Sequence, residues 1–159
     1  NVFKLEIEDE AIMRNQYGKP SFKNKEHIKF NISHCNGLIA CAVGLEEMGV
    51  DVENIRSFDD YVVIRVCNMK EINDIYSSHD SKRTFFTYWT MKESLGKALG
   101  VGLHYPLREN EFIKNGDGYL CNYEGLKIKN YEIDNKFSLS ICTDKNEEII
   151  LRGVNLDGR

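Results

Sequence analysis

The sequence predicts an α+β fold, and two observations carry that prediction. Runs rich in β-branched and apolar residues, typical of strands, gather ahead of residue 56 and again after residue 117. Between these groups, residues 82–100 show the apolar periodicity of an amphipathic helix. With 159 residues, 42% of them hydrophobic, the chain can bury one core without disulfides or a structural metal. We therefore expect one compact unit.

The first group of predicted strands is divided by turn-forming residues. Alternating apolar side chains predict a strand within residues 2–17, which ends at the breaker YGKP (17–20). Asn36 and Gly37 are good hairpin residues between the two runs that flank them. The later runs are HIKFNISHC (27–35), LIACAVGL (38–45) and GVDVENI (49–55).

The middle of the chain is predicted to be helical, beginning with two short helices. Ser57 is a fair N-cap for a helix that starts at Phe58. Asn68 can cap a second helix through MKEINDIY, residues 69–76.

A stronger helix follows. It begins at Asp80 or Ser81 and runs through KRTFFTYWTMKESLGKALG (82–100), with Gly100 as its C′ residue. The residues that can share its inward stripe are Phe85, Trp89 and Leu95 or Leu99.

The last part of the chain is predicted to be rich in strands. Asp134 and Asn135 predict a tight turn between two of the runs. The runs are GYLCNY (118–123), LKIKNYEI (126–133), FSLSICT (137–143) and IILRGV (149–154).

Charge and composition argue against several classes of function. The 21 basic and 25 acidic residues give a formal charge of −4, so no overall positive field would recruit nucleic acid or an anionic membrane. No apolar run approaches the roughly 18 residues of a membrane span and no signal peptide is recognisable, so we expect a cytoplasmic protein. The five cysteines lack CxxC spacing, which indicates thiols in a reducing compartment rather than a disulfide framework or a zinc site.

The stretch GVDVEN (49–54) places two carboxylates one residue apart. In an extended strand Asp51 and Glu53 share one face, while Val50 and Val52 share the other. Two like charges side by side resist ionisation unless a cation or a buried proton compensates them. An edge strand with its acidic face in water is the simpler interpretation of these residues taken alone.

Glu93 and Lys97 lie four residues apart and therefore on one face of the strong helix. A surface Glu–Lys pair is the ordinary interpretation, but the surrounding apolar residues leave little room for a solvated face. If Glu93 lies opposite Asp51 and Glu53, the three carboxylates would form the oxygen-ligand site that Mg²⁺ prefers. Lys97 could then contact a phosphate held by that metal.

Two further segments carry candidate phosphate contacts. Basic and small residues in YGKP (17–20) and the pair Ser33–His34 at a strand end could bind phosphate oxygens. A Ser–His pair at a strand end also forms ordinary local hydrogen bonds. Because no suitably spaced acid accompanies the pair, a hydrolase triad is not predicted.

Four motifs in order resemble a known family. YGKP, FNISHC, GVDVEN and WTMKESLGKALG resemble the Sfp type of the 4′-phosphopantetheinyl transferases, over about residues 15–142. The resemblance implies Mg²⁺-dependent transfer of the phosphopantetheine arm of coenzyme A to a serine of an acyl or peptidyl carrier protein, with release of 3′,5′-ADP. It also implies the 4′-phosphopantetheinyl transferase fold, a pseudo-dimer of two similar α/β halves with coenzyme A between them. Residues 1–50 would be a first half shortened at its N-terminus, on the coenzyme A side, and residues 51–159 the half with the metal-site and helix motifs.

The resemblance implies a role for each matching residue. Asp51, Glu53 and Glu93 would bind Mg²⁺, and Lys97 would hold the coenzyme A pyrophosphate and offset charge on the departing 3′,5′-ADP. Glu71 would be a candidate base for the carrier serine, with a metal-bound water as the alternative base. A solvated helical glutamate is the ordinary interpretation of Glu71.

The resemblance also implies a set of coenzyme A contacts. They are Tyr17, Gly18, Lys19 and Pro20 near the adenine, Ser33 and His34 at the phosphates, and Lys92 and Lys97 on the strong helix. His34 is in addition a candidate catalytic residue. Gly96 inside that helix costs up to about 1 kcal/mol relative to alanine and points to close backbone packing.

The sequence departs from the Sfp type at its front, where the basic residues that the family uses for the 3′-phosphate have no counterpart. Residue 1 is Asn rather than Met, so either a segment precedes this sequence or the protein is naturally short. A short form could act as a monomer or as a small homo-oligomer, as the trimeric holo-acyl-carrier-protein synthases of the superfamily do. The alternative functions are a Mg²⁺-dependent phosphohydrolase, an inactive coenzyme A or nucleotide-binding module, and a purely structural domain.

Overall fold

The computed structural model confirms the α+β class and describes residues 12–104 and 106–154. Its strands are β1 (Ile12–Arg14), β2 (Pro20–Phe22), β3 (Lys29–Cys35), β4 (Leu38–Gly44), β5 (Gly49–Asn54), β6 (Phe112–Asn115), β7 (Gly118–Cys121), β8 (Leu126–Ile133) and β9 (Phe137–Asp144). Its helices are α1 (Asp60–Val66), α2 (Met69–Ser77) and α3 (Ser81–Ala98), with short 3₁₀ turns at Gly102–His104 and Leu107–Glu109.

The main sheet of the described residues has five antiparallel strands in the order β5-β9-β8-β7-β6. Its β8–β9 hairpin turns at Asp134 and Asn135, whose φ angles are 51° and 55°. The turn is closed by a hydrogen bond of 3.0 Å from the Lys136 backbone N–H to the Ile133 carbonyl. Asp and Asn tolerate this left-handed backbone, and the predicted turn is confirmed.

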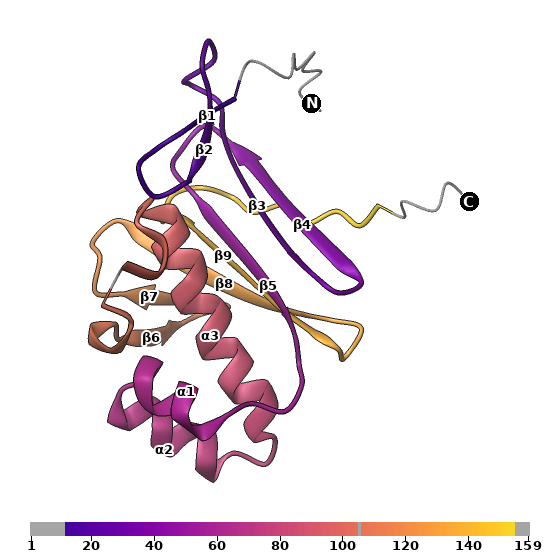
Figure 1. Cartoon of the computed structure of the whole chain (residues 1–159), viewed down its shortest axis with the longest axis vertical. Helices are drawn as coiled ribbons and strands as arrows, with labels where there is room; N and C mark the ends of the chain where they lie inside the picture. The colour runs from indigo at the N-terminus through magenta and orange to yellow at the C-terminus, as the bar shows by residue number, and fades with distance from the viewer. Residues whose placement is uncertain (1–11, 105, 155–159) are drawn as a thin grey trace.

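Helix α3 lies across the sheet and packs against β5, β9 and β8 (Figure 1). It begins where the Asp80 carboxylate accepts a hydrogen bond of 3.1 Å from the Arg83 backbone N–H. It ends before Gly100, which has a φ of 73°. Phe85 and Leu95 are buried on its inward side. The predicted start of the helix at Asp80 or Ser81 and the predicted C′ glycine are both confirmed.

The β3–β4 hairpin covers the opposite face of β5 and β9. Val50 and Val52 point to this side and pack with Leu139 of β9 and Ala40 of β4. Because side chains alternate along a strand, Asp51 points to the other side, toward α3. The alternation predicted for GVDVEN is therefore confirmed.

The two ends of α3 meet different parts of the chain. Near its N-terminal end, α1 and α2 enclose an apolar cluster that contains Val63, Ile75, Phe85 and Phe86. The β1–β2 hairpin lies at the opposite end of the molecule (Figure 1). No helix in residues 12–104 and 106–154 is long and apolar enough to cross a membrane.

The start of α1 differs from the prediction. Asp59, rather than Ser57, is the N-cap, and its carboxylate accepts a hydrogen bond of 2.8 Å from the Tyr61 backbone N–H. A carboxylate directly before the first turn satisfies an otherwise unpaired N–H and complements the helix dipole. The predicted cap of α2 at Asn68 is confirmed.

Several strand predictions need correction. IILRGV (149–154) forms no strand among the described residues, and Ile150 and Val154 are 70% and 80% exposed. An apolar run forms a strand only where it can pair with a neighbouring strand and bury one face. Strand β6 was not predicted, and Pro20 begins β2 rather than belonging to the turn. The front of the predicted strand within residues 2–17 lies outside the described residues.

The predicted division of the chain has a first half at residues 1–50 and a second half at residues 51–159. The predicted boundary between residues 50 and 51 falls inside β5. The division of the chain into two similar halves stays a prediction.

Candidate functional site

The backbone of β5 approaches α3 closely at Gly49. A Cβ atom there would lie 2.0 Å from the carbonyl oxygen of Ser94, so a side chain does not fit. This approach brings Asp51 against the last turns of α3. Gly96 has a similar explanation, because a Cβ atom there would lie 2.7 Å from the carbonyl oxygen of Gly102. The close packing predicted at Gly96 is confirmed.

Asp51 is the buried centre of the site, with 5% of its surface exposed. Its Oδ1 atom accepts hydrogen bonds from Ser33 Oγ at 2.9 Å and from Lys97 Nζ at 2.7 Å. Burial raises the pKa of the Asp51 carboxyl, although the Lys97 ammonium acts in the opposite direction. Strand β3, strand β5 and helix α3 thus meet at one carboxylate.

Lys97 donates to oxygen atoms on two strands. Its Nζ atom lies 3.0 Å from Ser33 Oγ, 3.1 Å from the Val50 carbonyl oxygen and 2.7 Å from Asp51 Oδ1. A lysine ammonium has three N–H donors, so these acceptors use all of them. The side chain is still 26% exposed.

Glu93 stands one turn before Lys97 on α3. The pKa of its carboxyl is raised to about 7, first by burial and then by the nearby charges of Asp51 and Glu53. Lys97 is the neighbour that lowers it. The structure therefore brings the predicted Asp51, Glu53, Glu93 and Lys97 into one electrostatic unit.

Glu53 lies at the more open edge of this unit. Its Oε2 atom is 2.7 Å from Nη1 of Arg56, and the Arg56 guanidinium lies over the Phe86 ring, 5.1 Å from its centroid. Glu53 is therefore held by a cation of the protein itself. Sequence reasoning missed Arg56, although a basic residue three positions after an acidic strand residue could have indicated it.

Two oxygen atoms of this unit fit a hard cation. Asp51 Oδ2 and Glu93 Oε1 are buried and have no hydrogen-bond partner among the described residues. Carboxylate oxygens of this kind are the ligands that Mg²⁺ prefers. Within residues 12–104 and 106–154, however, no three His, Cys, Asp or Glu side chains are grouped as a metal site. Arg56 contacts Oε2 of Glu53, so Oε1 of that carboxylate is the atom that could complete the predicted ligand set.

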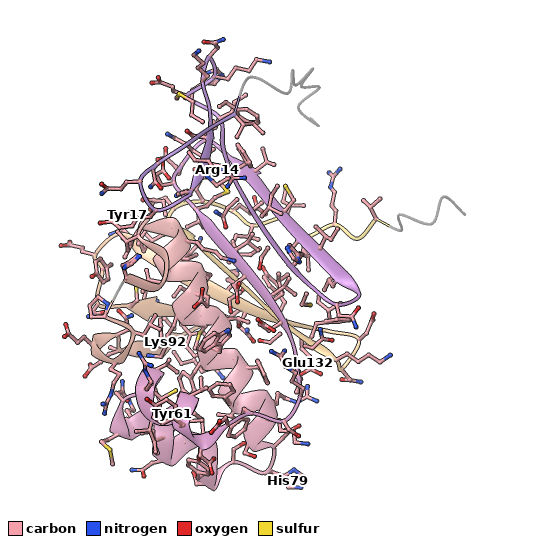
Figure 2. The ribbon with its side chains drawn as sticks, viewed as in Figure 1. Arg14, Tyr17, Tyr61, His79, Lys92 and Glu132 are labelled. Atoms are coloured by element: carbon pink, nitrogen blue, oxygen red, sulfur yellow. The ribbon has the colours of Figure 1, made fainter. Side chains whose placement is uncertain are left out.

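Glu71 and Lys92 form a separate buried pair. Lys92 Nζ lies 2.9 Å from Glu71 Oε2 and donates to the Leu107 carbonyl at 2.6 Å. Glu71 Oε2 also accepts from the Asn68 backbone N–H at 2.9 Å, which completes the capping box of α2. Burial raises the pKa of Glu71, and the charges acting on it are those of Lys92 and Asp74. The structure thus joins Glu71 to Lys92 (labelled in Figure 2) rather than to the carboxylates of β5.

The YGKP segment lies between β1 and β2, close to the C-terminal end of α3. Lys19 Nζ contacts Glu47 Oε2 at 2.6 Å and the Ala98 carbonyl at 2.9 Å. Lys19 and Pro20 line a cavity of about 430 Å³. Tyr17, labelled in Figure 2, is exposed, and its ring centroid lies 5.4 Å from that of His104. Gly18 supplies the left-handed turn with a φ of 87°.

The predicted pair Ser33–His34 lies on β3, where the two side chains point to opposite faces of the strand. Ser33 is buried and faces β5, whereas His34 is on the exposed face of β3. Asn31 shares the face of Ser33, and its side-chain oxygen accepts from the Val50 backbone N–H at 2.9 Å. Asn31 was not among the predicted residues. The alternation of polar residues in FNISHC could have indicated it.

Comparison with known proteins identifies relatives and a similar fold. A 4′-phosphopantetheinyl transferase of Bacillus subtilis is 31% identical over 134 residues, which are 80% of this chain and 60% of the relative. The 4′-phosphopantetheinyl transferase Sfp of Bacillus subtilis (strain 168) is 27% identical over 147 residues, 88% of this chain and 66% of the relative. The chain thus spans about two thirds or less of the length of these relatives. The crystal structure of Thermotoga maritima holo-[acyl-carrier-protein] synthase (AcpS) has a similar fold, with a TM-score of 0.52 over 64% of each chain at 16% identity.

The family model of the 4′-phosphopantetheinyl transferase superfamily matches residues 47–149. This range contains Asp51, Glu53, Glu71, Glu93 and Lys97. Because the match covers more than half of the sequence, the chain belongs to the 4′-phosphopantetheinyl transferase superfamily.

Proposed function

We propose that this protein transfers the 4′-phosphopantetheine arm of coenzyme A to a serine of an acyl or peptidyl carrier protein, in a Mg²⁺-dependent reaction that releases 3′,5′-ADP. The observation that carries the proposal is the contact between β5 and α3. There, Asp51 Oδ2 and Glu93 Oε1 are buried acceptors without partners among the described residues, and Lys97 stands beside them. Family membership and the names of the relatives support the same reaction.

The carboxylates would serve as the ligand set for a divalent cation. A bound Mg²⁺ would supply positive charge to the pyrophosphate of coenzyme A. Asp51 and Glu93 would hold it through the oxygens that have no partner among the described residues, and Glu53 would join them through Oε1 while Oε2 contacts Arg56.

Lys97 would act on the phosphates after a local exchange. Its three N–H groups are occupied by Ser33, Val50 and Asp51, so a phosphate oxygen must replace one of these acceptors. The Val50 carbonyl, at 3.1 Å, is the most distant of them. An ammonium turned toward the pyrophosphate would then offset the charge that develops on the departing 3′,5′-ADP.

The remaining predicted residues would also contact coenzyme A, some in their present positions and Lys92 only after a side-chain movement. The Tyr17–Pro20 turn would receive the adenine beside the cavity at Lys19, and Ser33 and exposed His34 would approach the phosphates. Lys92 would reach coenzyme A only by leaving Glu71, and the closed pair favours a structural role for it.

The base that takes the serine proton stays open between Glu71 and a water molecule in the site. Glu71 Oε1 has no hydrogen-bond partner among the described residues, but Glu71 is only 3% exposed. A carrier serine would reach it only if the Leu107 loop moved.

The location proposed for the protein is the cytoplasm. All five cysteines, each within the described residues, are free thiols, which supports a reducing compartment.

The test is a transfer assay. The purified chain is mixed with coenzyme A, Mg²⁺ and a panel of apo carrier proteins, and the intact carrier masses are measured with and without EDTA. We expect one phosphopantetheine to be added to the carrier serine, and EDTA to prevent it. Asp51→Asn should abolish transfer, whereas Asp117→Asn, the same change at an exposed carboxylate between β6 and β7, should not.

Other outcomes would replace the proposal with a specific alternative. Phosphate release without any carrier would indicate a Mg²⁺-dependent phosphohydrolase. Binding of coenzyme A without transfer to any carrier would indicate an inactive binding module. Wild-type transfer by Asp51→Asn at limiting Mg²⁺ would refute the metal assignment.

A further inference from the structure

A cluster of four polar side chains, three of them buried and one partly buried, lies between α3 and the main sheet. Its members are Thr90 of α3, Asn130 of β8, and Ser138 and Ser140 of β9. Thr90, Ser138 and Ser140 are 0%, 2% and 0% exposed. A helix can pack on a sheet with apolar side chains alone, so four polar groups at this contact need an explanation.

Hydrogen bonds connect all four members. Thr90 Oγ1 lies 3.0 Å from Ser138 Oγ and 2.8 Å from Ser140 Oγ, and the Asn130 amide donates to both serine hydroxyls at 3.0 Å. The Thr90 hydroxyl donates its single hydrogen to the Phe86 carbonyl at 2.9 Å, and therefore accepts from the serines. Each serine then accepts from Asn130 and donates to Thr90. In this arrangement each of the three hydroxyl groups both donates and accepts a hydrogen bond.

The sheet register places this cluster directly beside the carboxylates. Ser140 is the cross-strand partner of Asp51, and Ser138 is the partner of Glu53. Paired residues of neighbouring strands have side chains on the same face. On the helix, Thr90 precedes Glu93 by three residues and is therefore one turn away. The cluster thus ties the helical turn next to Glu93 to the strand next to Asp51.

We propose that Thr90, Asn130, Ser138 and Ser140 are positioning residues that hold Glu93 at a fixed height and rotation above Asp51. Apolar contacts would let α3 slide or turn by a fraction of an ångström, whereas directional hydrogen bonds at both Thr90 and Asn130 oppose that movement. The inference rests on the proposed function, because it treats Asp51 and Glu93 as ligands of one cation. Its consequence is that the cluster sets the affinity for the cation, although none of its members contacts the cation.

The test compares two substitutions of Thr90 with a matched control on the same helix. Thr90→Val keeps the shape and removes the hydroxyl, while Thr90→Ser keeps the hydroxyl. Ser94→Ala is the control, because Ser94 is also buried but its hydroxyl donates within its own helix, to the Met91 carbonyl at 2.9 Å. Mn²⁺ affinity is measured by electron paramagnetic resonance or calorimetry, together with thermal unfolding of each metal-free variant.

The expected result is a loss of about tenfold or more in Mn²⁺ affinity for Thr90→Val, with Thr90→Ser and Ser94→Ala close to wild type. If Thr90→Val does not fold, Ser140→Ala is measured in its place and is expected to show the same loss. Wild-type Mn²⁺ affinity in a folded Thr90→Val or Ser140→Ala protein would overturn the positioning role alone. Absence of Mn²⁺ binding by the wild-type chain would overturn the cation site, and the positioning role with it.

Discussion

Two carboxylate–lysine pairs, each with its lysine on α3, differ in a way that separates a structural role from a functional one. Lys92 and Glu71 are 1% and 4% exposed at their side chains, whereas Lys97 and Asp51 are 26% and 8% exposed. The N–O distances are nearly equal, at 2.9 Å and 2.7 Å. The two ion pairs are therefore similar in geometry but differ in their access to solvent and ligands. We call Glu71–Lys92 the closed pair and Asp51–Lys97 the open pair.

The surroundings of the two pairs extend this difference. The closed pair has further ties to structure, since Glu71 caps α2 and Lys92 bonds the Leu107 carbonyl and lies 5.3 Å from the centroid of the Phe112 ring. Each pair has one carboxylate oxygen without a partner among the described residues, Glu71 Oε1 and Asp51 Oδ2, but the open pair also adjoins Glu93, whose Oε1 is unpartnered there too. A more exposed pair beside a second unpartnered carboxylate can take a ligand, whereas a closed pair resists change.

The first way to sharpen the comparison is to make the same substitution in both lysines. Lys92→Met should lower the free energy of unfolding by about 3–5 kcal/mol, because it leaves the Glu71 carboxyl buried without its partner. Lys97→Met should lower it by less, since water already reaches that ammonium. Urea unfolding of both variants in EDTA measures the difference. Equal losses would contradict the distinction between a closed and an open pair.

The second test uses the same two variants in the transfer assay. Lys97→Met should lower the rate of transfer by about 10²–10³-fold, because it removes a cation aimed at developing phosphate charge. Lys92→Met should transfer at near wild-type rates at a temperature where it is folded. Glu71→Gln should behave like Lys92→Met if Glu71 is structural. A loss in Glu71→Gln as large as that in Lys97→Met would instead identify Glu71 as the base.

The predictions that succeeded from sequence depended on local chemistry. The turn at Asp134–Asn135, the cap at Asn68 and the start of α3 at Asp80 or Ser81 follow from residues suited to turns and helix ends. IILRGV (149–154) had the composition of a strand, but its pairing depended on a partner that local sequence does not specify.

The site was predictable where periodicity decides it. Alternation placed Asp51 and Glu53 on one face, and helical spacing placed Glu93 beside Lys97. The Glu71–Lys92 pair was not predictable, because it joins residues on two helices whose packing is set by the whole core. The resemblance implied a base for Glu71 and a coenzyme A contact for Lys92, and only the structure shows that the two residues form an ion pair.

A third test separates β5 from α3 at the open pair without changing any charged residue. Gly49→Ala should destabilise the protein by about 1–3 kcal/mol and weaken Mn²⁺ binding, because the new methyl group would push β5 away from the Ser94 carbonyl. Gly153→Ala is the control, since an added Cβ atom there meets nothing within 4 Å. Thermal unfolding and Mn²⁺ titration measure both effects. Tight cation binding in a destabilised Gly49→Ala protein would show that the site does not depend on this close approach.

The smallest expected effect is the dependence of the free energy of unfolding on the ionisation of Glu93. The pKa of Glu93 is raised from 4.5 to about 7 in the folded chain, so the folded state retains a proton that the unfolded state loses between these pH values. Stability due to this proton is present below pH 4.5 and is lost as the pH rises through 7. In EDTA, Glu93→Gln should therefore match the wild type near pH 4.5 and be more stable by roughly 1–2 kcal/mol at pH 8.

Urea unfolding of both proteins across that pH range measures the difference. A gain at pH 8 together with a loss of transfer would mean that Glu93 is retained at the expense of stability, as expected for a ligand rather than a structural residue. A difference in stability that does not change with pH would show that Glu93 is not the group that burial and the charges of Asp51 and Glu53 perturb. Glu71→Gln should instead destabilise the fold, because it leaves the Lys92 ammonium buried without its charged partner.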